Sequence, residues 1–99
     1  MLKDRVYEYL TKIPKARVVT YGQIAADLGN KGYARAIGNI LHNNPDPDKY
    51  PCFKVVNRKG ELAKHFGDLR GIDSQKERLE KDGIEVIDYC VDLNRYQWK

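Results

Sequence analysis

The apolar positions of the N-terminal residues predict a helix with one buried face. Residues 2–13 carry an apolar side chain at every third or fourth position, which is the period of an amphipathic helix. These positions are Leu2, Val6, Leu10 and Ile13. We expect Pro14 to end this helix, because proline lacks the backbone N–H that helical pairing needs.

A pair of short helices is predicted next. Residues 16–20 are rich in β-branched side chains and predict an extended segment or a small strand. Thr20 and Gln23 then have the spacing of a capping box, in which two side chains satisfy free N–H groups at a helix start. This helix ends at Gly29, and a second runs from about Tyr33 to His42. Two short helices joined by a glycine-containing turn predict a helix-turn-helix.

The two faces of the helix over 33–42 differ in polarity. The face expected to pack inward carries small and apolar residues, namely Ala34, Ile37, Gly38 and Leu41. The opposite face is free to meet a ligand and carries Arg35, Asn39 and His42. Residues 43–48 contain two prolines and predict a loop, since a residue before proline disfavours helical geometry.

The middle of the chain predicts a small β wing. Pro51 favours a turn that enters a short strand over 53–57, with Cys52 at its mouth. A glycine turn over 57–60 and a return strand at 61–62 would complete a hairpin. Residues 63–72 are irregular.

A polar helix and a second hairpin are predicted after the wing. Ser74 and Glu77 have capping-box spacing and would open a helix that runs to Asp82, with Gly83 as its C-terminal cap. Residues 84–93 favour a short hairpin that turns near Asp88, with Cys90 in the core. In the tail that follows, we expect Trp98 to be a packing anchor.

Length and composition limit the architecture. The 99 residues, of which 41% are apolar, predict a single domain over residues 1–99 with one small core. The predicted fold class is mainly α with a small β wing, a winged helix-turn-helix-like DNA-binding domain. No apolar run approaches about 20 residues, so no membrane span is expected. The first residues lack the apolar segment of a signal peptide, which predicts a cytoplasmic protein.

The cysteines and the charges add two further expectations. The two cysteines should be free thiols in a reducing compartment, and with no CxxC pair or His/Cys cluster we expect no metal site. Residues 1–67 carry 12 Lys/Arg against 6 Asp/Glu, whereas residues 68–99 carry 6 against 8. The basic part is consistent with a nucleic-acid face and equally with a solvated basic surface.

Five short motifs occur in an order that resembles a known family. They are residues 19–25 (VTYGQIA), residues 34–38 (ARAIG), Asn44-Pro45, Pro51-Cys52 and Asp82-Gly83. Together they are similar to the C-terminal domain of the O6-alkylguanine-DNA alkyltransferases and of their non-enzymatic relatives, the alkyltransferase-like proteins. The resemblance covers roughly residues 3–87. It implies a monomeric winged helix-turn-helix whose recognition helix lies in the minor groove of DNA, with no cofactor.

The resemblance also implies a set of DNA-binding residues, which are Tyr21, Arg35, Ala36, Gly38, Asn39 and Lys54. Arg35 would enter the base stack and fill the space of a flipped nucleotide, or it touches only phosphate or solvent. Tyr21 would lie near the phosphate of that nucleotide, or it packs as a helix-terminal aromatic. Small residues such as Ala36 and Gly38 would let the helix backbone approach a narrow groove.

The implied reaction centre is Cys52. In the alkyltransferases a cysteine–water–histidine–glutamate relay generates the thiolate. Here Asp82 matches the glutamate, Phe53 replaces the histidine and Lys54 replaces an arginine, so the relay is broken. Cys52 is therefore a nucleophile that lacks its usual base, or a small apolar residue that fills a pocket. The hinge and lesion pocket would involve Asn44, Pro51, Phe53, Val55, Val56 and residues 64–67.

Two residues could activate Cys52 in place of the missing histidine. Lys54 could stabilise a thiolate by its charge, although alternation along a strand directs it to the other face. His65 could supply an imidazole, or it is a surface histidine.

Three functions follow from these alternatives. The first is irreversible transfer of the alkyl group of O6-alkylguanine in duplex DNA to Cys52, a single-turnover cysteine S-methyltransferase. The second is binding of the flipped lesion without transfer, with nucleotide-excision repair proteins as further partners. The third is a general winged-helix DNA-binding protein.

Overall fold

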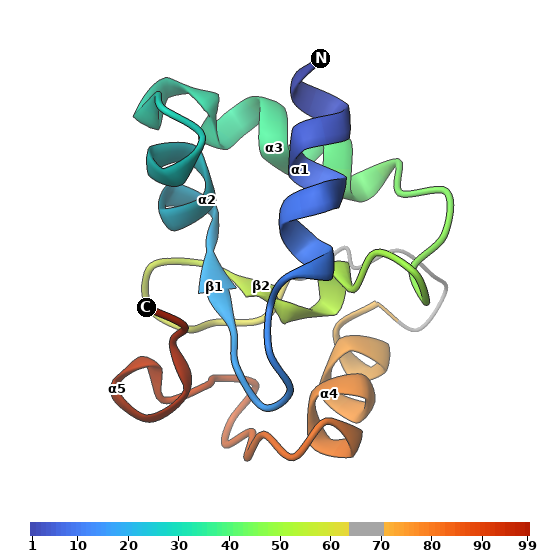
Figure 1. Ribbon diagram of the computed structural model, residues 1–99. Coiled ribbons are helices and arrows are strands. Elements are labelled where there is room, and N and C mark those ends of the chain that lie inside the picture. The colour runs from blue at the N-terminus through green and yellow to red at the C-terminus, as the bar shows by residue number, and fades with distance from the viewer. Residues whose placement is uncertain (64–70) are drawn as a thin grey trace.

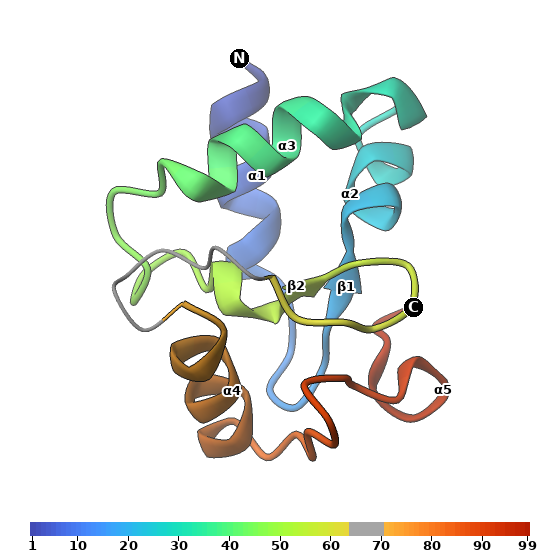
Figure 2. The same ribbon diagram turned by 180° about the vertical axis from the view of Figure 1, so that it is seen from behind.

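The computed structural model describes residues 1–63 and 71–99. Its N-terminal half is a group of three helices: α1 (Leu2–Thr11), α2 (Tyr21–Asp27) and α3 (Ala34–His42). Figures 1 and 2 show α1 and α3 crossing each other, with α2 beside them. The predicted roles of residues 64–67, including His65, lie outside the described residues.

The predicted first helix and capping box are confirmed. In α1 the buried residues are Val6, Tyr7 and Leu10. At the start of α2 the Gln23 N–H donates to the Thr20 hydroxyl at 3.0 Å, and the Gln23 side-chain oxygen accepts from the Thr20 N–H at 3.4 Å. After Gly29, a 3-10 turn, η1 (Lys31–Tyr33), leads directly into α3. The predicted helix-turn-helix is therefore confirmed.

The predicted β hairpin over 53–62 is wrong in its pairing. Residues Cys52–Lys54 form a 3-10 turn, η2, and only Val55–Val56 form strand β2. This strand pairs in parallel with β1 (Val19–Thr20), in the register Val19 to Val55 and Thr20 to Val56. Glu61 pairs with Cys90 instead of starting a return strand beside β2. The pairing partners are distant in sequence, which local patterning does not reveal.

The turn inside the predicted wing is confirmed. The Gly60 N–H donates to the Asn57 carbonyl at 2.9 Å, and Gly60 has a φ of +84°. A Cβ at this position would lie 2.1 Å from the carbonyl oxygen of Val91, so both the backbone angle and the close approach require glycine.

The capping box predicted at Ser74 is wrong, because the helix begins earlier. Helix α4 spans Ile72–Lys81 with Gly71 as its N-cap, and Ser74 lies inside it and is buried. Gly83 follows the helix with a φ of +91°, which confirms the predicted C-terminal glycine.

The C-terminal residues form a hairpin tip and a docked tail. Ile87 pairs with Cys90 across Asp88 and Tyr89, both of which have positive φ, so the predicted turn near Asp88 is confirmed. Helix α5 (Leu93–Tyr96) follows. The tail then pairs with Val18, whose carbonyl accepts from the Trp98 N–H at 2.8 Å.

The core consists of two apolar clusters. One lies among α1, α2 and α3, and the other lies between the sheet, α4 and the C-terminal residues; Phe53 packs against both. Trp98 packs against the first cluster and meets the Tyr9 ring edge-on, as expected of an anchor. The prediction that Cys90 is a core residue is wrong, because its thiol is only half-buried and donates to the Lys59 carbonyl. None of the helices in the described residues is long and apolar enough to cross a membrane.

Candidate functional site

The outer face of α3 presents two of the predicted DNA-binding residues. Arg35 and Asn39 are exposed, whereas Ala36 and Gly38 are partly buried. Gly38 does not pack into the core as predicted, because a Cβ built on it would meet no atom within 4 Å. Helix packing therefore does not require glycine at this position. The missing side chain instead leaves the helix backbone open to a close approach by a ligand.

Cys52 lies at the start of η2, and a short polar network holds the turn before it. The Tyr50 carbonyl accepts from the Cys52 N–H and from the Asn44 side-chain amide, each at 2.7 Å. The Tyr50 ring stacks on Tyr7 of α1 at a centroid distance of 4.8 Å. Asn44 thus joins the end of the α3 region to the turn that carries the thiol, which is the placement expected of a hinge residue.

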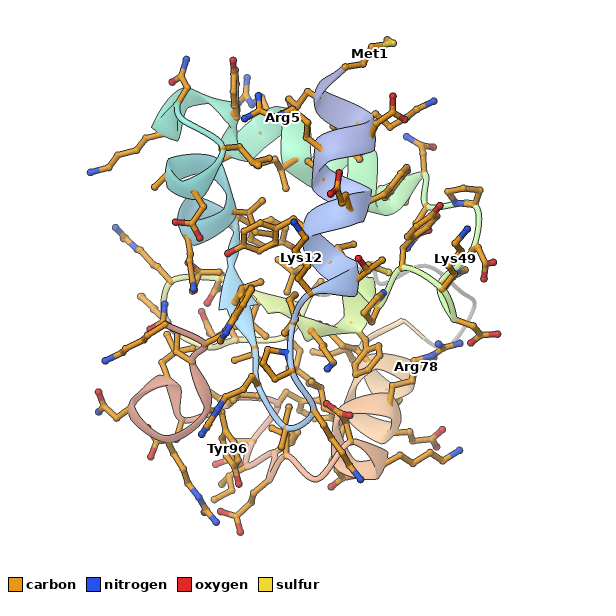
Figure 3. All side chains as sticks on the ribbon, viewed as in Figure 1. Met1, Arg5, Lys12, Lys49, Arg78 and Tyr96 are labelled. Atoms are coloured by element: carbon orange, nitrogen blue, oxygen red, sulfur yellow. The ribbon has the colours of Figure 1, made fainter. Side chains whose placement is uncertain are left out.

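The environment of Cys52 favours its protonated form. The side chain is only 7% exposed, and burial raises the pKa of the Cys52 thiol above its ordinary value. A hydrogen bond with Asn44 and the positive charge of Arg78 oppose this effect on the pKa without cancelling it. Arg78 lies on α4, at the edge of the molecule (Figure 3). Since an unperturbed thiol is only a few per cent ionised near pH 7, the thiolate is scarce here.

Lys54 and Asp82 are engaged with each other. The Lys54 ammonium lies 3.2 Å from an Asp82 carboxylate oxygen and also donates to the carbonyls of Ile13 and Pro14. The same Asp82 oxygen accepts from the Ala16 N–H at 2.9 Å. Lys54 is 6% exposed, so the prediction that it contacts DNA is wrong. The strand alternation used to orient it is also absent, because residues 52–54 form a 3-10 turn.

This ion pair bears on the predicted catalytic role of Asp82. In a relay the carboxylate orients an imidazole, but Asp82 is bound to an ammonium and a backbone N–H, and residue 53 is phenylalanine. Among the described residues, the structure therefore does not place a histidine and a carboxylate next to Cys52 as the relay requires.

Gln75 was missed by sequence reasoning. It is fully buried on α4, and its amide nitrogen donates to the carbonyls of Phe53 at 2.9 Å and Val55 at 3.0 Å. Its side-chain oxygen accepts from the Ala63 N–H at 2.7 Å. The available signal was its position four residues before Leu79, which places it on the buried stripe of an otherwise polar helix.

The predicted pocket residues near Cys52 in the chain are buried or partly buried, and Val55 belongs to the same apolar cluster as Cys52 whereas Val56 belongs to the other. Val55 and Val56 are buried, while Pro51 and Phe53 are partly buried beside them. Tyr21, at the start of α2, is half-buried; burial and the nearby Cys52 raise the pKa of its phenol.

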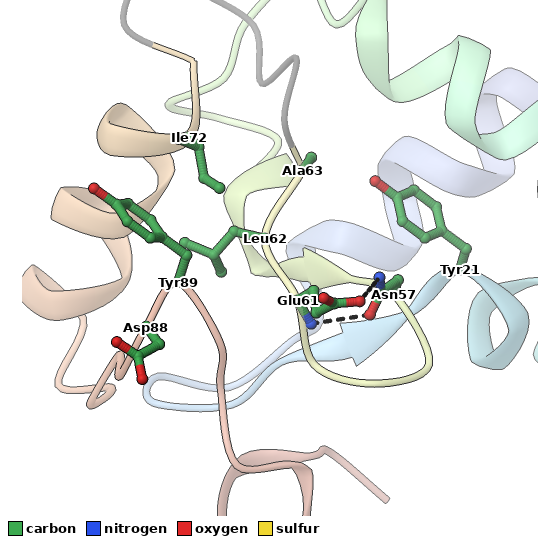
Figure 4. A pocket seen from close by; sticks show the side chains of 8 residues that line it. All are labelled: Tyr21, Asn57, Glu61, Leu62, Ala63, Ile72, Asp88 and Tyr89. Atoms are coloured by element: carbon green, nitrogen blue, oxygen red, sulfur yellow. Dashed lines mark hydrogen bonds between the residues drawn. The ribbon is translucent and has the colours of Figure 1, made fainter.

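A cleft opens next to Tyr21. Its volume is about 510 Å³, and its walls include Tyr21 on one side and Ile72 and Tyr89 on the other, as Figure 4 shows. Cys52 is not among the described residues that line it. Tyr21 therefore borders both the cleft and the neighbourhood of the thiol.

The family model described as the DNA-binding domain of 6-O-methylguanine DNA methyltransferase matches residues 1–84. The chain belongs to this family. The resemblance inferred from the five motifs is thus confirmed, and residues 85–99 lie beyond the matched part.

Relatives within the alkyltransferase family differ in what they are named for. The DNA base-flipping protein of Vibrio parahaemolyticus is 40% identical over 96% of this chain and 93% of its own length. Alkyltransferase-like protein 1 of Schizosaccharomyces pombe is 34% identical over 96% and 92%. The methylated-DNA–protein-cysteine methyltransferase of Salmonella typhimurium is 37% identical, but this chain matches only 46% of that enzyme.

A solved structure of the family shares the fold. The crystal structure of S. pombe Atl1 in complex with damaged DNA containing O6-carboxymethylguanine superposes with a TM-score of 0.86 at 33% identity, covering 98% of this chain and 94% of that one. The predicted fold class, mainly helical with a small sheet and matching a DNA-binding domain, is confirmed by this match.

Proposed function

We propose that the protein binds duplex DNA, turns an O6-alkylguanine out of the base stack and holds it near Cys52 without efficient alkyl transfer near neutral pH. The observation that carries this proposal is the state of the relay positions. Phe53 offers no proton acceptor, and Asp82 is bound to Lys54 at 3.2 Å. The relatives named DNA base-flipping protein and alkyltransferase-like protein 1 support the same function.

Base flipping requires a surface that approaches the duplex and a group that replaces the extruded base. The exposed face of α3 offers both, because Gly38 leaves the backbone open and Arg35 projects from the same helix. Extruding a base costs a few kcal/mol, and less when the base is damaged and poorly paired. Part of the preference for lesions would come from this difference, and the held lesion would remain available to nucleotide-excision repair proteins.

Transfer would require the thiolate of Cys52 to attack the alkyl carbon. The thiol proton first goes to solvent, the new S–C bond then forms as the C–O6 bond breaks, and the guanine, which stays attached to the DNA, takes up a proton at N1. The raised pKa of Cys52 makes the attacking species rare near pH 7. For this reason we propose binding of the lesion, and not alkyl transfer, as the main function.

A second candidate function is slow, single-turnover transfer to Cys52. It is favoured by the hydrogen bond with Asn44 and the charge of Arg78, which both lower the pKa of the thiol against the effect of burial. A suicide reaction occurs once per molecule, so a small thiolate population could still repair DNA over a long incubation.

One experiment separates the two functions. The protein is incubated with an O6-methylguanine duplex at several values from about pH 7 to about pH 10, and the peptide containing Cys52 is then examined by mass spectrometry. We expect unmodified peptide near neutral pH and methylated peptide only as the pH rises, because the thiol titrates above its usual range. Methylation of Cys52 that reaches completion near pH 7, even slowly over a long incubation, would overturn the binding proposal in favour of the second candidate.

The matched control is Cys52→Ala. It removes the acceptor and should retain full affinity for the lesion duplex, since binding does not depend on the thiol. Equal affinity of the unsubstituted protein for damaged and undamaged duplex would instead indicate general DNA binding.

A further inference from the structure

One face of α4 is directed at the turn that carries Cys52. Helix α4 packs against η2, and Gln75 donates to the carbonyls of residues 53 and 55 within and after that turn. Arg78 lies three residues further along α4 and therefore on the same face. The Arg78 side chain therefore starts from the face of α4 that packs against the thiol turn, one helical turn beyond a side chain that contacts it.

Arg78 also reaches the chain that precedes Cys52. One of its terminal nitrogens lies 3.4 Å from a carboxylate oxygen of Asp48, and the arginine side chain is 34% exposed. Figure 3 shows Arg78 on the same side of the molecule as Lys49, the neighbour of Asp48 in the loop between α3 and η2. The cation thus stands between the chain that enters the thiol turn and the helix that supports it.

The other ionisable groups around Cys52 do not offer it a free positive charge. Tyr7 from α1 and Tyr21 from α2 are phenols with raised pKa values, so they stay neutral while a thiol titrates. Lys54 in the same turn is held by Asp82. Among the described residues, Arg78 is the cation whose charge lowers the pKa of the Cys52 thiol.

We propose that Arg78 stabilises the thiolate form of Cys52 where the relay histidine is missing, and that Asp48 weakens this effect by pairing with the same guanidinium. Arg78 is a positioning residue of the site, since it acts through Cys52 and not on the DNA lesion. The inference concerns the same thiol as the proposed function and rests on it only for its biological consequence. It identifies a charge balance that adjusts how slowly Cys52 could take the alkyl group from a held lesion.

The size of the effect follows from exposure. A partly exposed guanidinium is screened almost as in water, so its charge changes the thiolate population by about threefold. A general base contributes roughly 10²–10⁴-fold to a proton-transfer step. Arg78 therefore adjusts the reactivity of Cys52 but does not replace the lost relay.

The test measures the thiol directly and uses no DNA. In a Cys90→Ser background, which removes the other free thiol, the rate of Cys52 alkylation by iodoacetamide is followed from about pH 7 to about pH 10 at low salt. We expect Arg78→Gln to slow alkylation about threefold near pH 8 and to move the midpoint of the pH profile upward. Arg78→Lys should preserve most of the rate, and Asp48→Asn should raise it and move the midpoint downward.

Two further readouts separate charge from structure. A change in access to the buried thiol would scale the rate at every pH, whereas a change in charge moves the midpoint. In about 1 M sodium chloride the difference between Arg78→Gln and the unsubstituted side chain should shrink, because salt screens a partly exposed charge. Asp48 is almost fully exposed, so Asp48→Asn keeps the fold and tests the proposal even if Arg78→Gln unfolds the protein.

Two outcomes would overturn the inference. One is that Arg78→Gln and Asp48→Asn move the midpoint of the Cys52 alkylation profile in the same direction. The other is that neither substitution moves this midpoint at low salt. Failure of the proposed function gives a different signature, namely no preference for the lesion duplex in a binding titration while the alkylation profiles still shift as expected.

Discussion

At the scale of single residues, the chemistry of this protein depends on what stands beside Cys52. Cys52 supplies a thiol, but the residue that follows it is phenylalanine, which has no group that could accept the thiol proton. Phe53 contributes instead to packing, since it contacts both apolar clusters. Burial then raises the pKa of the thiol, so packing and reactivity are opposed at this one turn.

Phe53→His should restore a proton acceptor next to Cys52. We expect methyl transfer from an O6-methylguanine duplex near pH 7 to become about tenfold faster, which is less than a well-oriented general base contributes, because Asp82 remains bound to Lys54 and cannot orient the imidazole. Single-turnover rates of Cys52 methylation measure this. Phe53→Leu is the matched control, because it keeps an apolar side chain without a base. If the histidine variant is no faster than the leucine variant, the missing base is not what limits transfer.

At the scale of elements, the Lys54–Asp82 ion pair joins segments that are far apart in sequence. Lys54 connects η2 to the carbonyls that follow α1, and Asp82 connects the end of α4 to the N–H of Ala16. Because Lys54 is 6% exposed, loss of its partner would leave a buried ammonium without its counter-charge.

Asp82→Asn should therefore destabilise the fold by about 3 kcal/mol, as measured by urea unfolding. Lys54→Met should cost less, because Asp82 is the less buried partner and keeps the Ala16 N–H. Adding Lys54→Met to Asp82→Asn should recover part of the loss, since it removes the unpaired buried charge. Strictly additive losses in the double variant would show that the pair carries no coupling.

Local signals predicted the helical elements well, and the pairings between distant segments poorly. The Thr20–Gln23 box and Gly83 could be found from sequence because each acts within one turn of its own helix. The parallel pairing of β1 with β2 could not, because it joins residues 19–20 to residues 55–56, which are far apart in the chain. The burial of Lys54 is not predictable from the sequence for the same reason, because its partner Asp82 is distant in the chain and no local pattern marks Lys54 as buried.

Helix α3 itself can be tested at Gly38. Alanine there would meet no atom within 4 Å and should stabilise the helix by about 1 kcal/mol, because glycine is a poor helix former. If the α3 backbone approaches the groove, the same substitution should weaken lesion DNA binding several-fold, so stability and affinity would change in opposite directions. Thermal unfolding and fluorescence titration measure the two.

Gly22→Ala provides the matched control for that substitution. Gly22 lies in the first turn of α2, and a Cβ there would also meet no atom within 4 Å. Gly22→Ala should leave the affinity for lesion DNA nearly unchanged. An equal loss of affinity in both variants would indicate that α3 has no special approach to DNA.

At the scale of the whole molecule, charge and shape contribute differently to DNA binding. The chain carries a net charge of +4, with the excess of Lys/Arg in residues 1–67. Phosphate contacts release counterions, so affinity for any duplex should fall as salt rises. Discrimination of a lesion is a ratio of two affinities, and the phosphate contribution cancels from it when both duplexes make the same contacts.

Arg35→Ala separates these contributions. If the exposed Arg35 side chain fills the space left by a flipped base, its loss should reduce lesion affinity much more than affinity for undamaged duplex, and the preference ratio should fall toward one. If Arg35 only contacts phosphate, both affinities should fall together and the slope of log affinity against log salt should decrease by about one. His42→Ala, an exposed position of α3 outside the predicted DNA-binding set, is the control for general disturbance of the helix. Titrating both duplexes at three or more salt concentrations measures ratio and slope together, and an unchanged ratio with a reduced slope would remove Arg35 from the flipping mechanism.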